Sequence, residues 1–94
     1  MTTASARHIL VSTEQACQDL LAQINSGETS FEAAASEFSQ CPSGKQGGDL
    51  GSFGPGMMVA EFDRVVFSED IGVVHGPVQT QFGYHLVEIT ERSQ

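Results

Sequence analysis

Two histidines and one cysteine are the side chains of this sequence best suited to chemistry. His8 lies in the first apolar stretch of the chain and His85 in the last, and Cys41 lies in a glycine-rich segment between them. If the two apolar stretches are paired strands, the imidazoles can meet on one face of a sheet and hydrogen-bond. A thiol near two imidazoles indicates a nucleophilic catalyst, a metal site or a polar network beside a binding pocket.

Each of these residues also has a simpler structural role. A single histidine in a strand is more often a satisfied core residue than a catalyst, and Cys17 lies on the apolar stripe of a helix, where it behaves as a small hydrophobic residue. A cysteine hydrolase needs an oxyanion hole and an orienting Asn or Asp, which the sequence does not identify. The spacing of Cys41 and the three histidines, His75 included, matches no paired-ligand zinc pattern. A thiol or metal enzyme stays open as an alternative, which Cys41 reactivity or retained zinc would reveal.

Length and charge exclude several classes of protein. With 94 residues the chain forms one domain, residues 1–94, with a core over about residues 6–91. Its net charge of −8, from 4 Lys and Arg against 12 Asp and Glu, opposes binding to nucleic acid or to an anionic membrane. No apolar run reaches the roughly 20 residues of a membrane-spanning helix, and the polar start lacks the apolar core of a signal peptide. We therefore expect a cytoplasmic protein, and its two cysteines cannot build a disulfide scaffold.

The hydrophobic pattern predicts an α+β domain with a small, mainly antiparallel sheet. Strands are predicted over residues 6–11, 49–53, 73–80 and 84–90. Capping boxes predict two helices that begin at Ser12 and Thr29, the first of which ends at Gly27. Apolar spacing predicts a third helix over residues 59–67. Because Pro77 lacks an N–H, the strand that contains it is expected at a sheet edge or with a bulge.

The segment over residues 39–56 is rich in glycine and is predicted to be a functional loop. It matches neither a Walker sequence nor a strand-to-helix GxGxxG, and Lys45 is its only cation. Its glycines are therefore interpreted as providing tight turns rather than a phosphate site. Met58, Phe62 and Phe82 are core candidates when taken singly, but beside this loop they can line a shallow apolar pocket.

Several segments together resemble the parvulin class of peptidyl-prolyl cis/trans isomerases, the PpiC or rotamase type. They are His8-Ile-Leu-Val11, the run Cys41-Pro-Ser-Gly-Lys-Gln-Gly-Gly-Asp-Leu-Gly-Ser-Phe53, Gly56-Met-Met58, Phe62, and Gly76-Pro-Val-Gln-Thr-Gln-Phe-Gly-Tyr-His85. The Gly-Gly-Asp-Leu-Gly and Phe-Gly-Tyr-His motifs, in this order, are highly specific. The resemblance covers residues 6 to 91, nearly the whole chain.

The resemblance implies a fold and a set of site residues. The fold is the parvulin, FKBP-like α+β fold, with a four-stranded antiparallel sheet and about three to four helices around it. The family's catalytic positions match His8, Cys41 and His85. Its proline pocket and the positions beside it match Leu50, Met58 and Phe62, the rim residues Thr80 and Phe82, and Asp49 next to the pocket leucine.

The resemblance also implies an activity: acceleration of X–Pro bond rotation in peptides and in unfolded or partly folded proteins. We expect a monomer that uses no cofactor and no metal and stabilises the twisted amide non-covalently. Residues 12–15 contain no Lys or Arg, which predicts an apolar residue before proline rather than a phosphorylated one. The alternative function is a peptide-binding or chaperone module without turnover. The chain matches the minimal stand-alone bacterial type, and the alternative location is that of a domain excised from a periplasmic chaperone.

Overall fold

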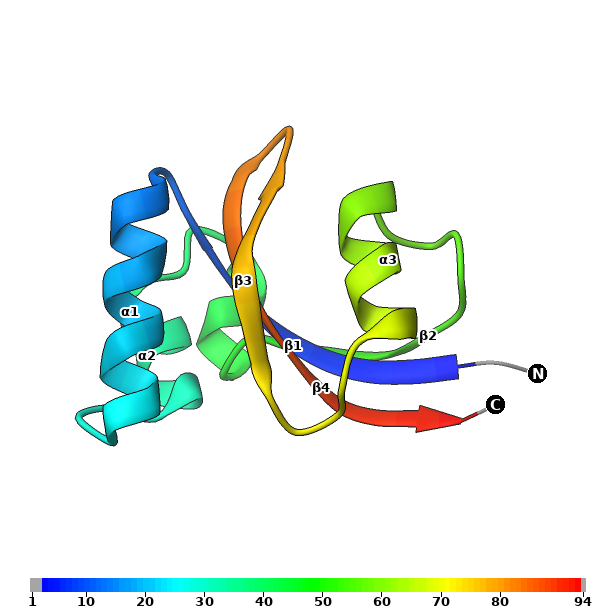
Figure 1. The fold of residues 1–94 in the computed structure, drawn as a ribbon, viewed down its shortest axis with the longest axis horizontal. Helices are drawn as coiled ribbons and strands as arrows, with labels where there is room; N and C mark the ends of the chain where they lie inside the picture. The colour runs from blue at the N-terminus through cyan, green and yellow to red at the C-terminus, as the bar shows by residue number, and fades with distance from the viewer. Residues whose placement is uncertain (1–2, 94) are drawn as a thin grey trace.

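The computed structural model describes residues 3–93 and contains one antiparallel sheet with helices on both faces (Figure 1). The strands are β1 (Thr3–Val11), β2 (Asp49–Phe53), β3 (Val74–Thr80) and β4 (Gly83–Ser93). Their order across the sheet is β2-β1-β4-β3, so the first and last strands of the chain are the central pair. The predicted α+β fold with four antiparallel strands is confirmed.

The helices lie at the predicted places, with the caps of the first two shifted by one residue. They are α1 (Glu14–Ser26), α2 (Phe31–Phe38), α3 (Ala60–Ser68) and a short 3-10 helix η1 (Pro42–Gln46), which the sequence did not predict. The Thr13 side chain accepts a hydrogen bond from the Ala16 amide, and Ser30 caps α2 in the same way. The predicted cap at Ser12 is wrong because the Ser12 hydroxyl instead accepts a hydrogen bond from the Gln40 side chain.

Two separate cores form because alternate residues of the central strands face opposite sides of the sheet. On one face, Ile9, Val11 and Leu86 pack against α1 and α2. On the other face, Ala4, Ala6 and Val87 pack with Phe53 and with residues of α3. Figure 1 shows α1 and α2 on one side of the sheet and α3 on the other. His8 is in phase with Ala6, so its side chain lies on the α3 side.

Arg7, the neighbour of His8, lies on the opposite face and ties three elements together. Its guanidinium donates hydrogen bonds to Glu32 of α2 and to Glu88 of β4. It also lies over the ring of Phe31, 5.4 Å from the ring centroid. This contact fixes α2, and the loop that follows it, to the two central strands.

The strand that contains Pro77 is an edge strand and is bulged, as predicted. β3 pairs only with β4, and the register between them shifts between His75 and Val78. At this position in the sheet, no hydrogen bond is required from the backbone nitrogen of Pro77.

Gly48 brings the glycine-rich loop against β1 at His8. The His8 amide donates to the Gly48 carbonyl at 2.9 Å, and Gly48 has a φ of +84°. A Cβ at Gly48 would lie 2.3 Å from the His8 carbonyl oxygen. Only glycine allows the two backbones to approach this closely, which supports the interpretation of the glycines as providers of tight turns.

We expect Gly48→Ala to destabilise the protein more than Gly27→Ala. Gly27 has the same φ of +84° but has no atom within 4 Å of the position of its Cβ. Gly27→Ala should lower the free energy of unfolding only by the cost of placing alanine in the left-handed region, roughly 1–2 kcal/mol. Gly48→Ala should lower the free energy of unfolding by about 1–3 kcal/mol more, because its Cβ collides with the His8 backbone. Urea unfolding of both variants measures this difference, and equal losses would contradict the close approach.

Candidate active site

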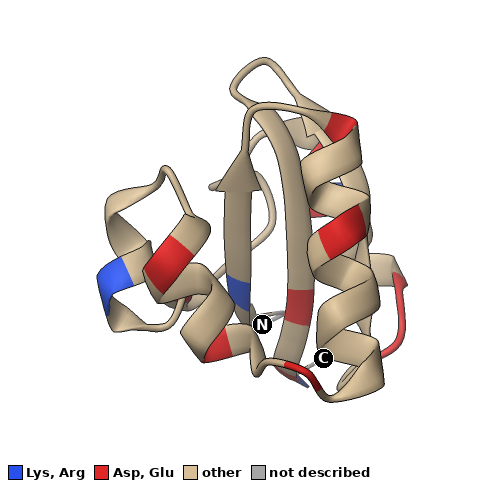
Figure 2. Ribbon diagram, turned by 90° about the vertical axis from the view of Figure 1, so that its left-hand side faces the viewer, with Lys and Arg blue, Asp and Glu red and all other residues tan. Residues whose placement is uncertain are grey.

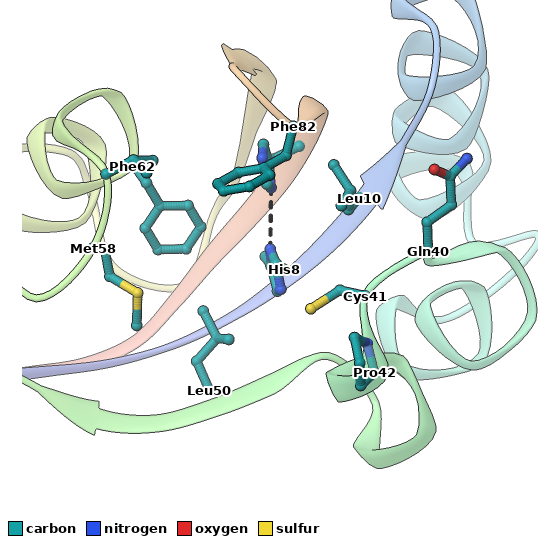
Figure 3. Close-up of a pocket in the computed structure, with 11 residues that line it drawn as sticks. His8, Leu10, Gln40, Cys41, Pro42, Leu50, Met58, Phe62 and Phe82 are labelled. Atoms are coloured by element: carbon teal, nitrogen blue, oxygen red, sulfur yellow. Dashed lines mark hydrogen bonds between the residues drawn. The ribbon is translucent and has the colours of Figure 1, made fainter.

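A mainly apolar pocket of about 370 Å³ opens between α3 and the loop at Cys41 (Figure 3). Residues from five parts of the chain line it: His8 and Leu10 of β1, Gln40, Cys41 and Pro42 after α2, Leu50 of β2, Met58, Val59 and Phe62 in or before α3, and Phe82 and His85 around the last turn. The structure therefore brings together seven of the nine predicted site residues. The other two, Thr80 and Asp49, lie elsewhere.

Leu50, Met58 and Phe62 form one apolar end of this pocket (Figure 3). Phe62 is buried at its base, and its ring meets both imidazoles nearly at right angles. The ring centroids lie 5.6 Å from that of His8 and 5.9 Å from that of His85. Phe82 is 61% exposed at the mouth, so one wall of the pocket is formed by a side chain open to solvent.

Thr80 and Asp49 do not line the pocket. Thr80 is buried behind His85, where its hydroxyl lies 2.8 Å from the imidazole Nε2. Asp49 is exposed, and its carboxylate accepts a hydrogen bond from the Gly51 amide. Asp49 adjoins Leu50 on a strand, where successive side chains face opposite sides, and Leu50 is the one that enters the pocket.

A continuous hydrogen-bonded network passes beneath the pocket. The Nδ1 atoms of His8 and His85 are 3.1 Å apart. His8 Nε2 lies 3.1 Å from the Ser43 hydroxyl, which lies 3.3 Å from the Cys41 sulfur. Together with the Thr80 contact, these bonds connect β3, β4 and β1 to the loop at η1. The expectation that the two histidines meet and reach Cys41 through polar contacts agrees with this geometry.

One assignment of the protons gives every hydroxyl and ring N–H of this network an acceptor, and it begins at a backbone amide. The Phe82 N–H donates to the Thr80 hydroxyl oxygen at 3.2 Å, so the Thr80 hydrogen is free to donate to His85 Nε2. His85 then holds its proton on Nδ1 and donates to His8. The proton of His8 is on Nε2 and points to Ser43, whose hydroxyl donates to the Cys41 sulfur. This arrangement uses every hydroxyl and ring N–H once.

Burial keeps both imidazoles neutral at physiological pH. The two rings are nearly parallel, 15° apart, and their residues are only 6% and 4% exposed. Burial, together with a smaller contribution from repulsion by a charged His85, lowers the pKa of His8 to about 4. Burial also lowers the pKa of His85. Since neither ring charges easily, both imidazoles are neutral hydrogen-bonding groups at physiological pH.

Sequence reasoning missed Ser43, the bridge between His8 and Cys41. A serine after Cys-Pro in a glycine-rich segment carries no distinguishing pattern. Only the unpredicted 3-10 turn η1 aims its hydroxyl back at both partners. Gln40, Leu10, Pro42 and Val59 were also missed: Gln40 and Val59 lie outside the motifs that carried the resemblance, and Leu10 and Pro42 lie within them but were assigned no role.

The described residues offer little support for a metal site or a membrane-spanning segment. Within residues 3–93, no group of three or more His, Cys, Asp or Glu side chains is arranged to hold a metal ion. His75 points away from the pair, and its Nε2 lies 2.8 Å from the carbonyl oxygen of Asp70. Among the same residues, no helix combines the length and apolar character needed to cross a bilayer.

We expect the folded protein to lose stability as the pH falls from about 6.5 to about 4. His8 takes up a proton near pH 4 when folded but near 6.5 when unfolded, so the unfolded chain binds more protons in this window. The free energy of unfolding therefore decreases on acidification, and the contribution of His8 is constant below this range. NMR titration of the imidazole resonances checks the midpoint, with the urea-unfolded chain as the control. A folded-state midpoint at or above 6.5 would contradict the burial argument.

Comparisons with known proteins agree with this geometry. The family model of the PPIC-type PPIase domain matches residues 4–91. The foldase protein PrsA of Geobacillus kaustophilus is 42% identical over 90 residues, which are 95% of this chain and 32% of that protein. The chain thus spans about a third of the length of the curated relatives it matches.

Solved structures of related proteins share the fold. The crystal structure of the peptidyl-prolyl isomerase PrsA from Bacillus anthracis is similar with a TM-score of 0.94 at 36% identity, over 99% of this chain and 43% of that one. A structure from a study of SurA-like chaperones of Campylobacter jejuni, PEB4 and the periplasmic protein Cj1289, is similar with a TM-score of 0.89 at 33% identity, over 97% of this chain and 39% of that one. The fold implied by the sequence motifs is confirmed.

Proposed function

Because this chain belongs to the PpiC-type peptidyl-prolyl cis/trans isomerase family, we propose that its pocket binds the proline ring of an X–Pro bond and stabilises the amide as it twists. The observation that carries this proposal is the apolar end formed by Leu50, Met58 and Phe62 directly beside the neutral histidine pair. A proline ring is apolar and fits a pocket of about 370 Å³ together with part of its neighbours. No cofactor is needed, because no bond is made or broken.

The task of the site is to lower a barrier. Rotation about a peptide bond costs roughly 18–20 kcal/mol, whereas the two isomers at X–Pro differ by only about 0.5–1 kcal/mol. Each tenfold acceleration requires about 1.4 kcal/mol of binding that the twisted amide receives and the planar amide does not. An apolar surface provides such selectivity, because the twisted amide loses resonance and is less dipolar than the planar one.

In this proposal the hydrogen-bonded histidine network maintains the shape of the pocket and takes part in no covalent or proton-transfer step. His8 and His85 support Phe62 from below, and the network delivers one hydrogen bond from Ser43 to the Cys41 sulfur. That bond fixes the sulfur at the wall of the pocket. A covalent attack by Cys41 is the competing mechanism, but it needs a base beside the thiol, whereas the group that contacts the Cys41 sulfur is the Ser43 hydroxyl, a hydrogen-bond donor.

We expect Cys41→Ser to keep activity within about tenfold of the unchanged protein, because a hydroxyl still accepts the hydrogen bond from Ser43. Cys41→Ala should lose more, because it leaves the Ser43 hydroxyl without this acceptor. Cys17→Ala is the matched control: this thiol is buried between α1 and the sheet, where burial raises its pKa to about 11. Values of kcat/KM from a protease-coupled assay with a proline peptide compare the three variants with the unchanged protein. A Cys41→Ser variant no faster than the uncatalysed reaction would favour covalent catalysis.

The residue before proline should be apolar. Among the side chains that line the pocket, none belongs to Lys, Arg, Asp or Glu. A phosphate or carboxylate before proline would therefore be desolvated without a partner, which is costly.

A peptide series with Leu, Phe, Glu or phosphoserine before proline tests this preference. We expect the highest kcat/KM for Leu and Phe, with losses of at least about tenfold for Glu and phosphoserine. A clear preference for phosphoserine would overturn the proposed specificity. NaCl titration serves as the control, since an apolar preference should change little with ionic strength.

A peptide-binding module without turnover is the competing function. The exposed Phe82 at the mouth and the apolar pocket suit binding as well as catalysis. NMR titration with a proline peptide and the coupled assay separate the two functions. Binding without acceleration would establish the module, whereas acceleration supports the isomerase.

We propose folding proteins as the substrates, because the relatives are named as foldases and chaperones. We also propose a location outside the cytoplasm, because one of the two chaperones in the study of the similar Campylobacter jejuni structure, Cj1289, is described as periplasmic. This replaces the expected cytoplasmic location with its alternative, the isomerase domain of a periplasmic type of chaperone. The expectation of a monomer stays a prediction, for which light scattering is the measurement.

A further inference from the structure

A second hollow, which we call the α1 groove, lies between α1 and the end of α2. It has a volume of about 400 Å³, and its walls include Val11, Ala16, Leu20 and Phe38, with Asp19 and Gln40 at its edges. The Phe38 side chain belongs to none of the buried clusters and is 46% exposed. The exposed ring extends the apolar wall of the hollow, and an apolar hollow with polar groups around it is a candidate binding site.

The α1 groove and the proline pocket lie on opposite sides of β1 and meet at Gln40. Gln40 lines both hollows, and the neighbours Leu10 and Val11 of β1 line one each. The Gln40 amide donates to the Leu10 carbonyl at 2.8 Å, and its side chain bonds to Ser12, so this residue is held between the two hollows. Figure 3 shows Gln40 and Leu10 at the end of the pocket away from Phe62 and Met58.

We propose that the α1 groove binds an apolar side chain of the same peptide whose proline occupies the pocket, with a basic residue next to it at Asp19. This inference rests on the proposed isomerase function. A substrate that is a protein chain must leave the pocket as an extended strand, which advances about 3.3–3.6 Å per residue. A peptide that crosses Gln40 at the end of β1 meets the apolar wall of the α1 groove, which places residues a few positions from proline there.

Charge favours a basic neighbour over an acidic one. α1 contains Glu14 and Asp19 and no Lys or Arg, and Figure 2 shows only acidic positions coloured along this helix. Asp19 is exposed at the edge of the groove, where its carboxylate accepts a hydrogen bond from Gln15 at 2.9 Å. The cation of a substrate Lys or Arg is therefore attracted here, and a phosphate is repelled, in a protein with a net charge of −8.

The test compares matched peptides that share one central Leu-Pro. In the anchored set a Phe-Lys pair is placed two, three or four residues from proline on either side, and in the reference peptide Gly-Ser replaces it. We expect the best anchored peptide to bind at least about tenfold more tightly than the reference. Only the anchored peptides should shift the amide resonances of Ala16, Leu20 and Phe38.

Two variants locate this gain in the groove. Phe38→Ala removes the exposed ring, and Asp19→Lys reverses the charge. Each should remove most of the tenfold gain in affinity of the anchored peptide. Neither should change the affinity for the reference peptide. Asp70→Lys is the control for net charge, because Asp70 lies in the turn between α3 and β3 and lines neither hollow. It should preserve the gain.

The outcomes separate this proposal from the isomerase proposal. If no anchored peptide binds more tightly, or if the gain survives both groove variants, the α1 groove is not a subsite, whatever the rate of isomerisation. If the gain is present and sensitive to both variants but neither peptide is isomerised, the groove is established and the isomerase function fails. An equal loss in Asp70→Lys and Asp19→Lys would show long-range attraction instead of a site.

Discussion

The hydrogen bond between two buried imidazoles is the contact on which the rest of the site depends. It forms only if β1 and β4 are central neighbours in the register that pairs Leu10 with His85 and His8 with Val87. The two rings are then diagonal neighbours on one face, close enough for their Nδ1 atoms to bond. Because this face is the one that α3 covers, the pair lies under Phe62, and the apolar pocket and the polar network share a single wall.

The glycine-rich loop connects that wall to the thiol. Its backbone approaches His8 at Gly48, where a side chain would collide with β1, and the preceding turn η1 aims Ser43 at His8. On the opposite face, Arg7 fixes α2 to the central strands and thereby anchors the start of the loop. The position of the Cys41 sulfur is thus set by backbone packing on one side of the sheet and by an ion-pair network on the other.

Much of the fold follows from local patterns, whereas the site depends on pairing. Period-two alternation described the two central strands, and short extended runs predicted the two edge strands; the expected meeting of His8 with His85 needed only the assumption that their strands pair. The family motifs located Leu50, Met58 and Phe62, but the same motifs placed Asp49 beside the pocket although strand alternation turns it away. Ser43 and the α1 groove could not be predicted, because a 3-10 turn and the space between two helices leave no periodic signal in the sequence.

A site without charge suits a reaction that changes the dipole of an amide and transfers no proton. A charged side chain in the pocket would interact most strongly with the planar amide, whose resonance separates charge, and would therefore stabilise the ground state more than the twisted state. Neutral imidazoles avoid this, and burial favours the neutral form because it lowers the pKa of both rings. The network thus gives the pocket a rigid polar support while the surface that meets the proline stays apolar. In the proposed mechanism, selectivity for the twisted amide comes from the exclusion of charge from the pocket as well as from its apolar contacts with proline.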